Sequence, residues 1–119
     1  MGLEATAIWS ACEQGRLSGH LVASTLTDIF YIAHRITDLQ HAHAAVRVCL
    51  DTFAICPVDR AALEVARNLP GNDFEDNLLI ACAMLAGLDS IVTRNQRDFQ
   101  AASLTILSPT DLLAQLTHS

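Results

Sequence analysis

The stretch 73–99, DFEDNLLIACAMLAGLDSIVTRNQRDF, constrains the fold of this chain more than any other part of the sequence. Asp73 is a good helix N-cap, and the apolar run after it predicts a helix over 74–86. Gly87 suits the left-handed position that follows many helices. Residues 90–93 (SIVT) then predict a short strand. A buried helix followed at once by a strand is typical of an α/β domain.

The rest of the chain continues this alternation. Ser24 or Thr25 is a predicted cap that places Asp28 in a first helical turn, and Asp59 is the next predicted cap. Because strands alternate with helices, we predict one α/β domain over residues 1–119, with a mostly parallel sheet and helices on both faces. Further helices are predicted over 3–14, 26–35, 38–53, 60–68 and 110–116, strands over 20–24, 54–58 and 105–107, and a turn or helical turn over 95–99.

The composition indicates in which cellular compartment to expect the protein. No apolar run reaches the roughly 18 residues of a membrane span, and no charged segment leads into an apolar one at the N-terminus. We therefore expect a cytoplasmic protein with no membrane partner. Four cysteines lie in apolar segments without CxxC spacing, so we expect them to be reduced and buried: Cys12, Cys49, Cys56 and Cys82.

The formal net charge of −6 argues against loose electrostatic binding of nucleic acid. An acidic protein can still act on a phosphodiester if metal ions neutralise its carboxylates locally. Histidine does not supply such a site, because His41 and His43 lie about 200° apart on a helix and cannot share a metal ion.

Three aspartates are the best candidates for chemistry. Asp28 and Asp98 each follow a predicted strand, and Asp76 begins a helix, so all three can meet at one edge of a parallel sheet. Converging carboxylates raise each other's pKa unless a cation is present. Mg²⁺ or Mn²⁺ would relieve this repulsion and would support metal-assisted hydrolysis of a phosphodiester. The alternative is that these acids only complement helix dipoles, with Thr93 and Asn95 as ordinary turn residues.

Three segments carry a resemblance to a known family: 24–31 (STLTDIFY), 73–83 (DFEDNLLIACA) and 93–99 (TRNQRDF). The chain resembles the PIN domain, close to VapC-like and PilT N-terminus-like ribonucleases, over nearly its whole length. The resemblance implies that Asp28, Asp76 and Asp98 are catalytic and bind Mg²⁺ or Mn²⁺, with Thr93 and Asn95 in supporting roles. Asp28 stands where most of the family has the longer Glu.

The N-terminal end departs from the family pattern. The family begins with a central strand that carries an Asp ligand, and no segment here matches it. The remaining strands must therefore close up or be completed by something else. Since open central edges favour association, we expect a partner chain, such as a second copy, to cover them in a homo-oligomer.

Three functions follow from the resemblance. The first is a metal-dependent ribonuclease acting on RNA, which as the toxin of a toxin–antitoxin pair would also bind an antitoxin. The second is a catalytically inactive remnant that oligomerises or binds partners. The third is a fragment whose first strand is encoded upstream of Met1. The missing acid weighs against full activity, and the sequence does not choose an RNA.

Overall fold

The computed structural model describes residues 3–99 and 103–117 and confirms the α/β class. The observed elements match the predicted ones to within about three residues at each boundary. They are α1 (Leu3–Glu13), β1 (His20–Val22), α2 (Ala23–Ile36), α3 (Leu39–Thr52), β2 (Ala54–Cys56), α4 (Arg60–Arg67), α5 (Phe74–Leu85), β3 (Ser90–Val92), the 3₁₀ helix η1 (Gln96–Phe99), β4 (Thr105–Leu107) and α6 (Pro109–Thr117).

The strands pair in parallel, as predicted, but within the described residues they form two separate two-stranded sheets. In one sheet β1 pairs with β2, with Leu21 opposite Ile55, and in the other β3 pairs with β4, with Ile91 opposite Ile106. A continuous sheet would need a ladder between a strand of one pair and a strand of the other, and the described residues contain no such ladder. One predicted alternative was that the remaining strands close up into a single sheet. The structure shows two separate sheets instead.

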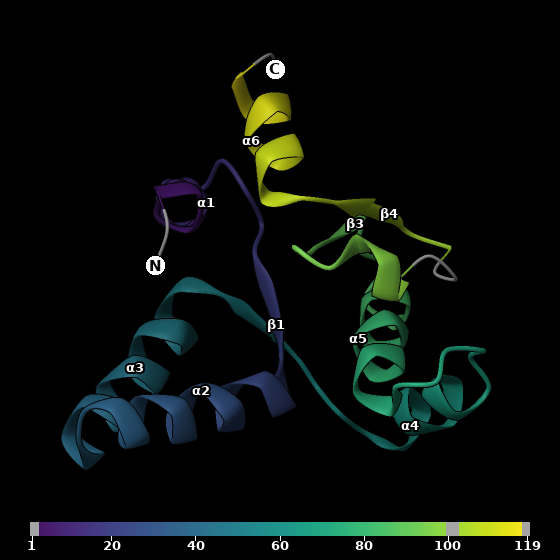
Figure 1. Cartoon of the computed structure of the whole chain (residues 1–119), viewed down its shortest axis with the longest axis horizontal. Coiled ribbons are helices and arrows are strands. Elements are labelled where there is room, and N and C mark those ends of the chain that lie inside the picture. The colour runs from purple at the N-terminus through teal and green to yellow at the C-terminus, as the bar shows by residue number, and fades with distance from the viewer. Residues whose placement is uncertain (1–2, 100–102, 118–119) are drawn as a thin grey trace.

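Three pairs of helices surround these strands (Figure 1). Helix α2 packs on α3, α4 packs on α5, and α1 packs on α6. Strand β1 runs between the α2–α3 pair and the rest of the chain. Trp9 of α1 makes an edge-to-face contact with Phe53 at the end of α3, with ring centroids 4.9 Å apart. This contact links the α1–α6 pair to the α2–α3 pair.

Helix α5 forms the centre of the core. Its buried side chains Leu78, Ala81 and Cys82 pack with Val22 of β1 and Cys56 of β2. The Cys82 thiol also donates to the carbonyl oxygen of Pro57, at 3.7 Å. Helix α5 also contacts β3 and η1. One helix therefore supports both sheets.

The helix caps test the local predictions. The side chains of Asp59 and Asp73 cap α4 and α5, and Gly87 has a φ of +66°, as predicted. The predicted cap at Ser24 or Thr25 is wrong, because β1 leads directly into α2 and both residues lie inside the helix. Asp28 therefore lies in the second turn of α2.

The four cysteines are free thiols, as predicted. Three of them are buried, Cys12 is half-buried, and burial raises the pKa of every one of these thiols. Within the described residues, no helix combines the length and the apolar character needed to cross a membrane.

Small side chains set the distance between α4 and α5. Ala62 and Ala66 of α4 are almost fully buried against α5. We expect Ala66→Leu to overpack this contact and to lower the free energy of unfolding by about 1–3 kcal/mol. Ala61→Leu, on the exposed side of the same helix, is the matched control and should leave stability nearly unchanged. Urea unfolding measures both, and an equal effect of the two variants would contradict this packing.

Candidate functional site

The first turn of α5 is held by its N-cap. An Asp73 side-chain oxygen accepts the backbone N–H of Asp76 at 3.0 Å, and the Asp73 carbonyl accepts that of Asn77 at 3.0 Å. Asp residues favour this position because the carboxylate satisfies a free N–H and complements the helix dipole. The cap thereby fixes where the Asp76 side chain leaves the helix.

Asn77 positions the turn that leads into α5. It is buried, with 5% of its surface exposed, and its amide donates to the carbonyl of Gly71 at 2.9 Å. A Cβ on Gly71 would lie 2.4 Å from the Asn77 side-chain oxygen, so only glycine fits there without movement. The sequence analysis missed this contact. The sequence does contain a signal for this contact, because Asn77 is a polar residue on the apolar face of a predicted helix.

The polar cluster after β3 forms a compact turn. The Thr93 hydroxyl accepts the backbone N–H of Asn95 at 3.0 Å, and the Asn95 carbonyl accepts the N–H of Asp98 at 3.0 Å. Phe99 is buried, and η1 packs against α5. Thr93 and Asn95 thus shape the turn that carries Asp98 toward α5.

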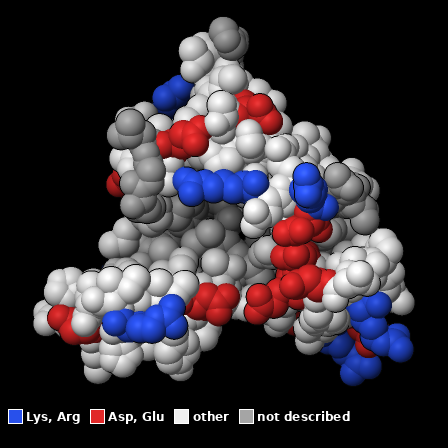
Figure 2. Space-filling view, in the orientation of Figure 1, with Lys and Arg blue, Asp and Glu red and all other residues white. Residues whose placement is uncertain are grey.

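The structure brings Asp76 and Asp98 into one acidic cluster with Asp73 and Glu75. The pKa of Asp76 is raised, first because the side chain is partly removed from water and then by the negative charges of Asp73, Asp98 and Glu75. Figure 2 shows acidic side chains in a strip over the region where α5 and η1 lie in Figure 1. The four acids of this cluster are called the α5 acidic cluster below.

Asp28, the third predicted ligand, is not part of this cluster. It is exposed on α2 and is not among the charges that shift the pKa of Asp76. In the parts of the chain that the structure describes, no three His, Cys, Asp or Glu side chains are arranged to hold a metal ion. Of the three predicted acids, the structure therefore brings two together.

The α5 acidic cluster nevertheless has the chemistry of a magnesium or manganese site. Carboxylate oxygens are the ligands these ions prefer, and Mg²⁺ is commonly held by one or two carboxylates with water and substrate phosphate. Among the described residues, no ion pair involves any acid of the cluster. Asp76 and Asp98 could therefore hold one hydrated cation between them.

A comparison with protein-family models finds a match to the PIN domain over residues 3–97. The match covers most of the chain, so the chain belongs to the PIN domain family. Members of this family are generally nucleases and generally depend on divalent metal ions. No curated protein matches the chain.

Two substitutions at Asp73 separate capping from charge. Asp73→Ala removes the cap of α5, so we expect the free energy of unfolding to fall by about 1 kcal/mol. Asp73→Asn keeps an oxygen acceptor and removes one negative charge beside Asp76, so it should cost less than the alanine variant. Urea unfolding at neutral pH measures both. Equal losses would show that the cap contributes nothing.

The raised pKa of Asp76 predicts how the stability of the protein depends on pH. Its raised pKa means that the folded state binds a proton there more tightly than the unfolded state. The stability this gives is fully present below the unfolded pKa and is lost as the pH rises through the higher folded pKa. Asp76→Asn cannot titrate, so its stability relative to the unmodified protein should improve as the pH rises from about 3 to about 7.

Urea unfolding across that pH range measures this difference, and Asp111→Asn is the control, since Asp111 is an exposed acid in the first turn of α6. A difference between Asp76→Asn and the unmodified protein that stays constant with pH would contradict the electrostatic environment described here.

Proposed function

We propose that this protein is a PIN-family ribonuclease that uses Mg²⁺ or Mn²⁺ to hydrolyse a phosphodiester bond of RNA. The observation that supports this most directly is the α5 acidic cluster, where partial removal from water and then the charges of Asp73, Asp98 and Glu75 raise the pKa of Asp76, and no described ion pair involves any of these acids. A cluster of this kind is stabilised by a divalent cation. The family match makes a nuclease the activity that such a cation would serve.

The proposed roles follow the geometry. Asp76 and Asp98 bind the cation, the Asp73 cap fixes the first turn of α5, and Thr93 and Asn95 hold the turn that presents Asp98. Asp28 of α2 is the proposed third ligand. A bound cation would lower the pKa of a water molecule and stabilise negative charge on the phosphate. In a cytoplasmic toxin–antitoxin pair, this protein would be the toxin and its antitoxin would be a second partner.

A second candidate function is that of a catalytically inactive module that binds partners or a second copy. Helix α2 supports it, because no residue of this described 14-residue helix is buried. Tyr31, Ile32 and Ile36 are large apolar side chains that α2 exposes, Ile36 by 73%. An exposed apolar helix face of this kind marks an interaction surface. The absence of a metal-holding group of three His, Cys, Asp or Glu side chains among the described residues points the same way.

One experiment distinguishes the two functions. Mn²⁺ binding is measured by calorimetry and cleavage of a structured RNA is followed, for the unmodified protein and for Asp76→Asn, Asp98→Asn and Asp111→Asn. If the nuclease proposal holds, the first two variants should each weaken Mn²⁺ binding and slow cleavage by about tenfold or more, and EDTA should abolish cleavage. Asp111→Asn changes charge equally but lies outside the cluster, so it should leave both unchanged.

Equal residual cleavage by the unmodified protein and by Asp76→Asn would overturn the nuclease proposal. Light scattering on the same samples then tests the second function. A stable oligomer that is disrupted by Ile36→Asp would support an interaction module, whereas a monomer at all concentrations would contradict self-association.

A further inference from the structure

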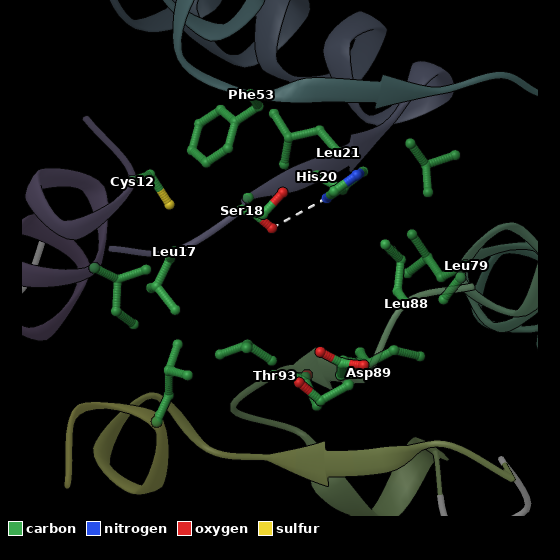
Figure 3. Close-up of a pocket in the computed structure, with 18 of the residues that line it drawn as sticks. Cys12, Leu17, Ser18, His20, Leu21, Phe53, Leu79, Leu88, Asp89 and Thr93 are labelled. Carbon is green, nitrogen blue, oxygen red and sulfur yellow. Dashed lines mark hydrogen bonds between the residues drawn. The ribbon is translucent and has the colours of Figure 1, made fainter. Parts of the chain in front are cut away.

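Two hollows in this molecule differ in chemistry. The larger lies between the two sheets, and its apolar wall includes Leu79 and Leu88, which also pack against the buried core (Figure 3). The smaller has a volume of about 330 Å³ and lies against α4 and the first residue of α5. Two arginines, one acid and two apolar side chains line it. These five residues are called the α4 patch below: Arg60, Leu63, Glu64, Arg67 and Phe74.

The packing of α4 determines which of its side chains face solvent. Ala62 and Ala66 are buried, whereas every residue of the α4 patch is exposed. Arg60 and Arg67 are seven residues apart, so they lie on the same side of the helix, two turns and roughly 10 Å apart along its axis. Figure 2 shows basic side chains gathered at the lower right, where α4 lies in Figure 1. The α4 patch is therefore a basic surface on an acidic protein.

The positive charge of the α4 patch is largely available to a ligand. Within the described residues, Arg67 takes part in no ion pair, and Arg60 pairs only with Glu64, at 3.5 Å. An exposed ion pair between residues four apart on a helix is weak, so another anion can replace Glu64. Arginine also suits phosphate in particular, because its planar guanidinium group forms two parallel hydrogen bonds and stacks on flat rings.

Phe74 adds a flat apolar surface beside this charge. Its side chain is 50% exposed, although it belongs to α5, whose later residues form the core. Exposed aromatic rings next to basic side chains are the usual means of binding single-stranded nucleic acid, since a base stacks on the ring while the cations contact phosphates. A hollow of about 330 Å³ holds a flat group the size of a nucleobase, but no helix or folded segment.

We propose that the α4 patch binds single-stranded RNA, with one base stacked on Phe74 and neighbouring phosphates on Arg60 and Arg67. A duplex does not fit, because its base faces are already stacked on one another. An acidic peptide would occupy the arginines but would leave the ring without a flat partner. The inference deepens the proposed function and rests on it for the choice of RNA as the polymer.

The α4 patch adjoins the α5 acidic cluster. Phe74 follows the Asp73 cap and precedes Asp76 by two residues, so both lie in the first turn of α5. Two residues correspond to about 200° around a helix, and a strand that reaches both side chains must cross the start of α5. The positive end of the helix dipole favours phosphate there. The patch would thus position RNA beside the cluster without touching the reacting atoms.

Fluorescence anisotropy with a labelled adenosine RNA of about ten nucleotides tests this binding. The full chain is titrated in EDTA, so that metal-dependent cleavage cannot occur and the result does not depend on activity. Binding should be saturable, and pairing the RNA with its complement should weaken it by about tenfold. Contacts with two phosphates predict that log Kd rises with log salt concentration with a slope of about 1.4.

Matched substitutions locate the binding surface. Phe74→Leu keeps an apolar side chain but removes the flat ring, so it should weaken binding by about tenfold, whereas Phe74→Trp should retain it. Tyr31→Leu changes an exposed aromatic residue of α2 and should have no effect. Arg67→Ala should weaken binding by about fivefold and lower the salt slope by about 0.7. Arg35→Ala, exposed on α2, should leave both unchanged.

Cleavage measured with Mn²⁺ separates this inference from the proposed function. If both hold, Phe74→Leu should raise KM and leave kcat unchanged, whereas Asp76→Asn should lower kcat without weakening RNA binding in EDTA. RNA binding that depends on Phe74 and Arg67, without any cleavage, would contradict the nuclease and still support the α4 patch as an RNA-binding surface.

Three results would overturn the proposal for the α4 patch. The first is the absence of saturable RNA binding at protein concentrations up to about 100 μM. The second is that Phe74→Leu or Arg67→Ala, folded as judged by circular dichroism, binds the RNA as tightly as the unmodified protein. The third is that the RNA duplex, or a labelled glutamate peptide of similar length, binds as tightly as the single strand.

Discussion

The burial of α5 is the interaction on which the rest of the structure depends. Its apolar face packs on Val22 and Cys56 of the first sheet, and the same helix contacts β3 and η1. Fully burying an aliphatic side chain such as Leu78 is worth about 1.5–3 kcal/mol, which is large beside the few hydrogen bonds of a three-residue strand pair. The sheets are therefore held mainly through α5, and the acids at its first turn are fixed to the core.

Local physical chemistry made much of this predictable from the sequence. Asp59 and Asp73 sit before apolar helical runs, where a cap is worth about 1 kcal/mol, and Gly87 takes a φ that other residues avoid. The predictions failed where the local structure depends on the rest of the fold. Ser24 and Thr25 are residue types that often cap helices. Here α2 begins at Ala23, directly after β1, so both residues lie inside the helix. Asn77 was missed because its partner, the Gly71 carbonyl, is defined only by the fold.

The residues of the candidate site show the same difference between what local sequence predicts and what depends on long-range packing. Asp76 and Asp98 come together because α5 and η1 pack directly on each other, over a short stretch of chain. Asp28 belongs to α2, which follows β1, and no described strand pairs β1 with β3. Its distance from the cluster depends on how the two sheets are placed, and no periodicity or spacing in the sequence contains that information.

The gap between the two sheets and the incomplete acidic cluster then have one physical origin. Between β1 and β3 the described residues provide apolar walls but no hydrogen-bonded ladder. Asp28 follows β1, whereas Asp98 follows β3. The separation between these two carboxylates is therefore set by how the two sheets pack on each other. Because apolar packing is non-directional, it fixes this separation less closely than a strand ladder would.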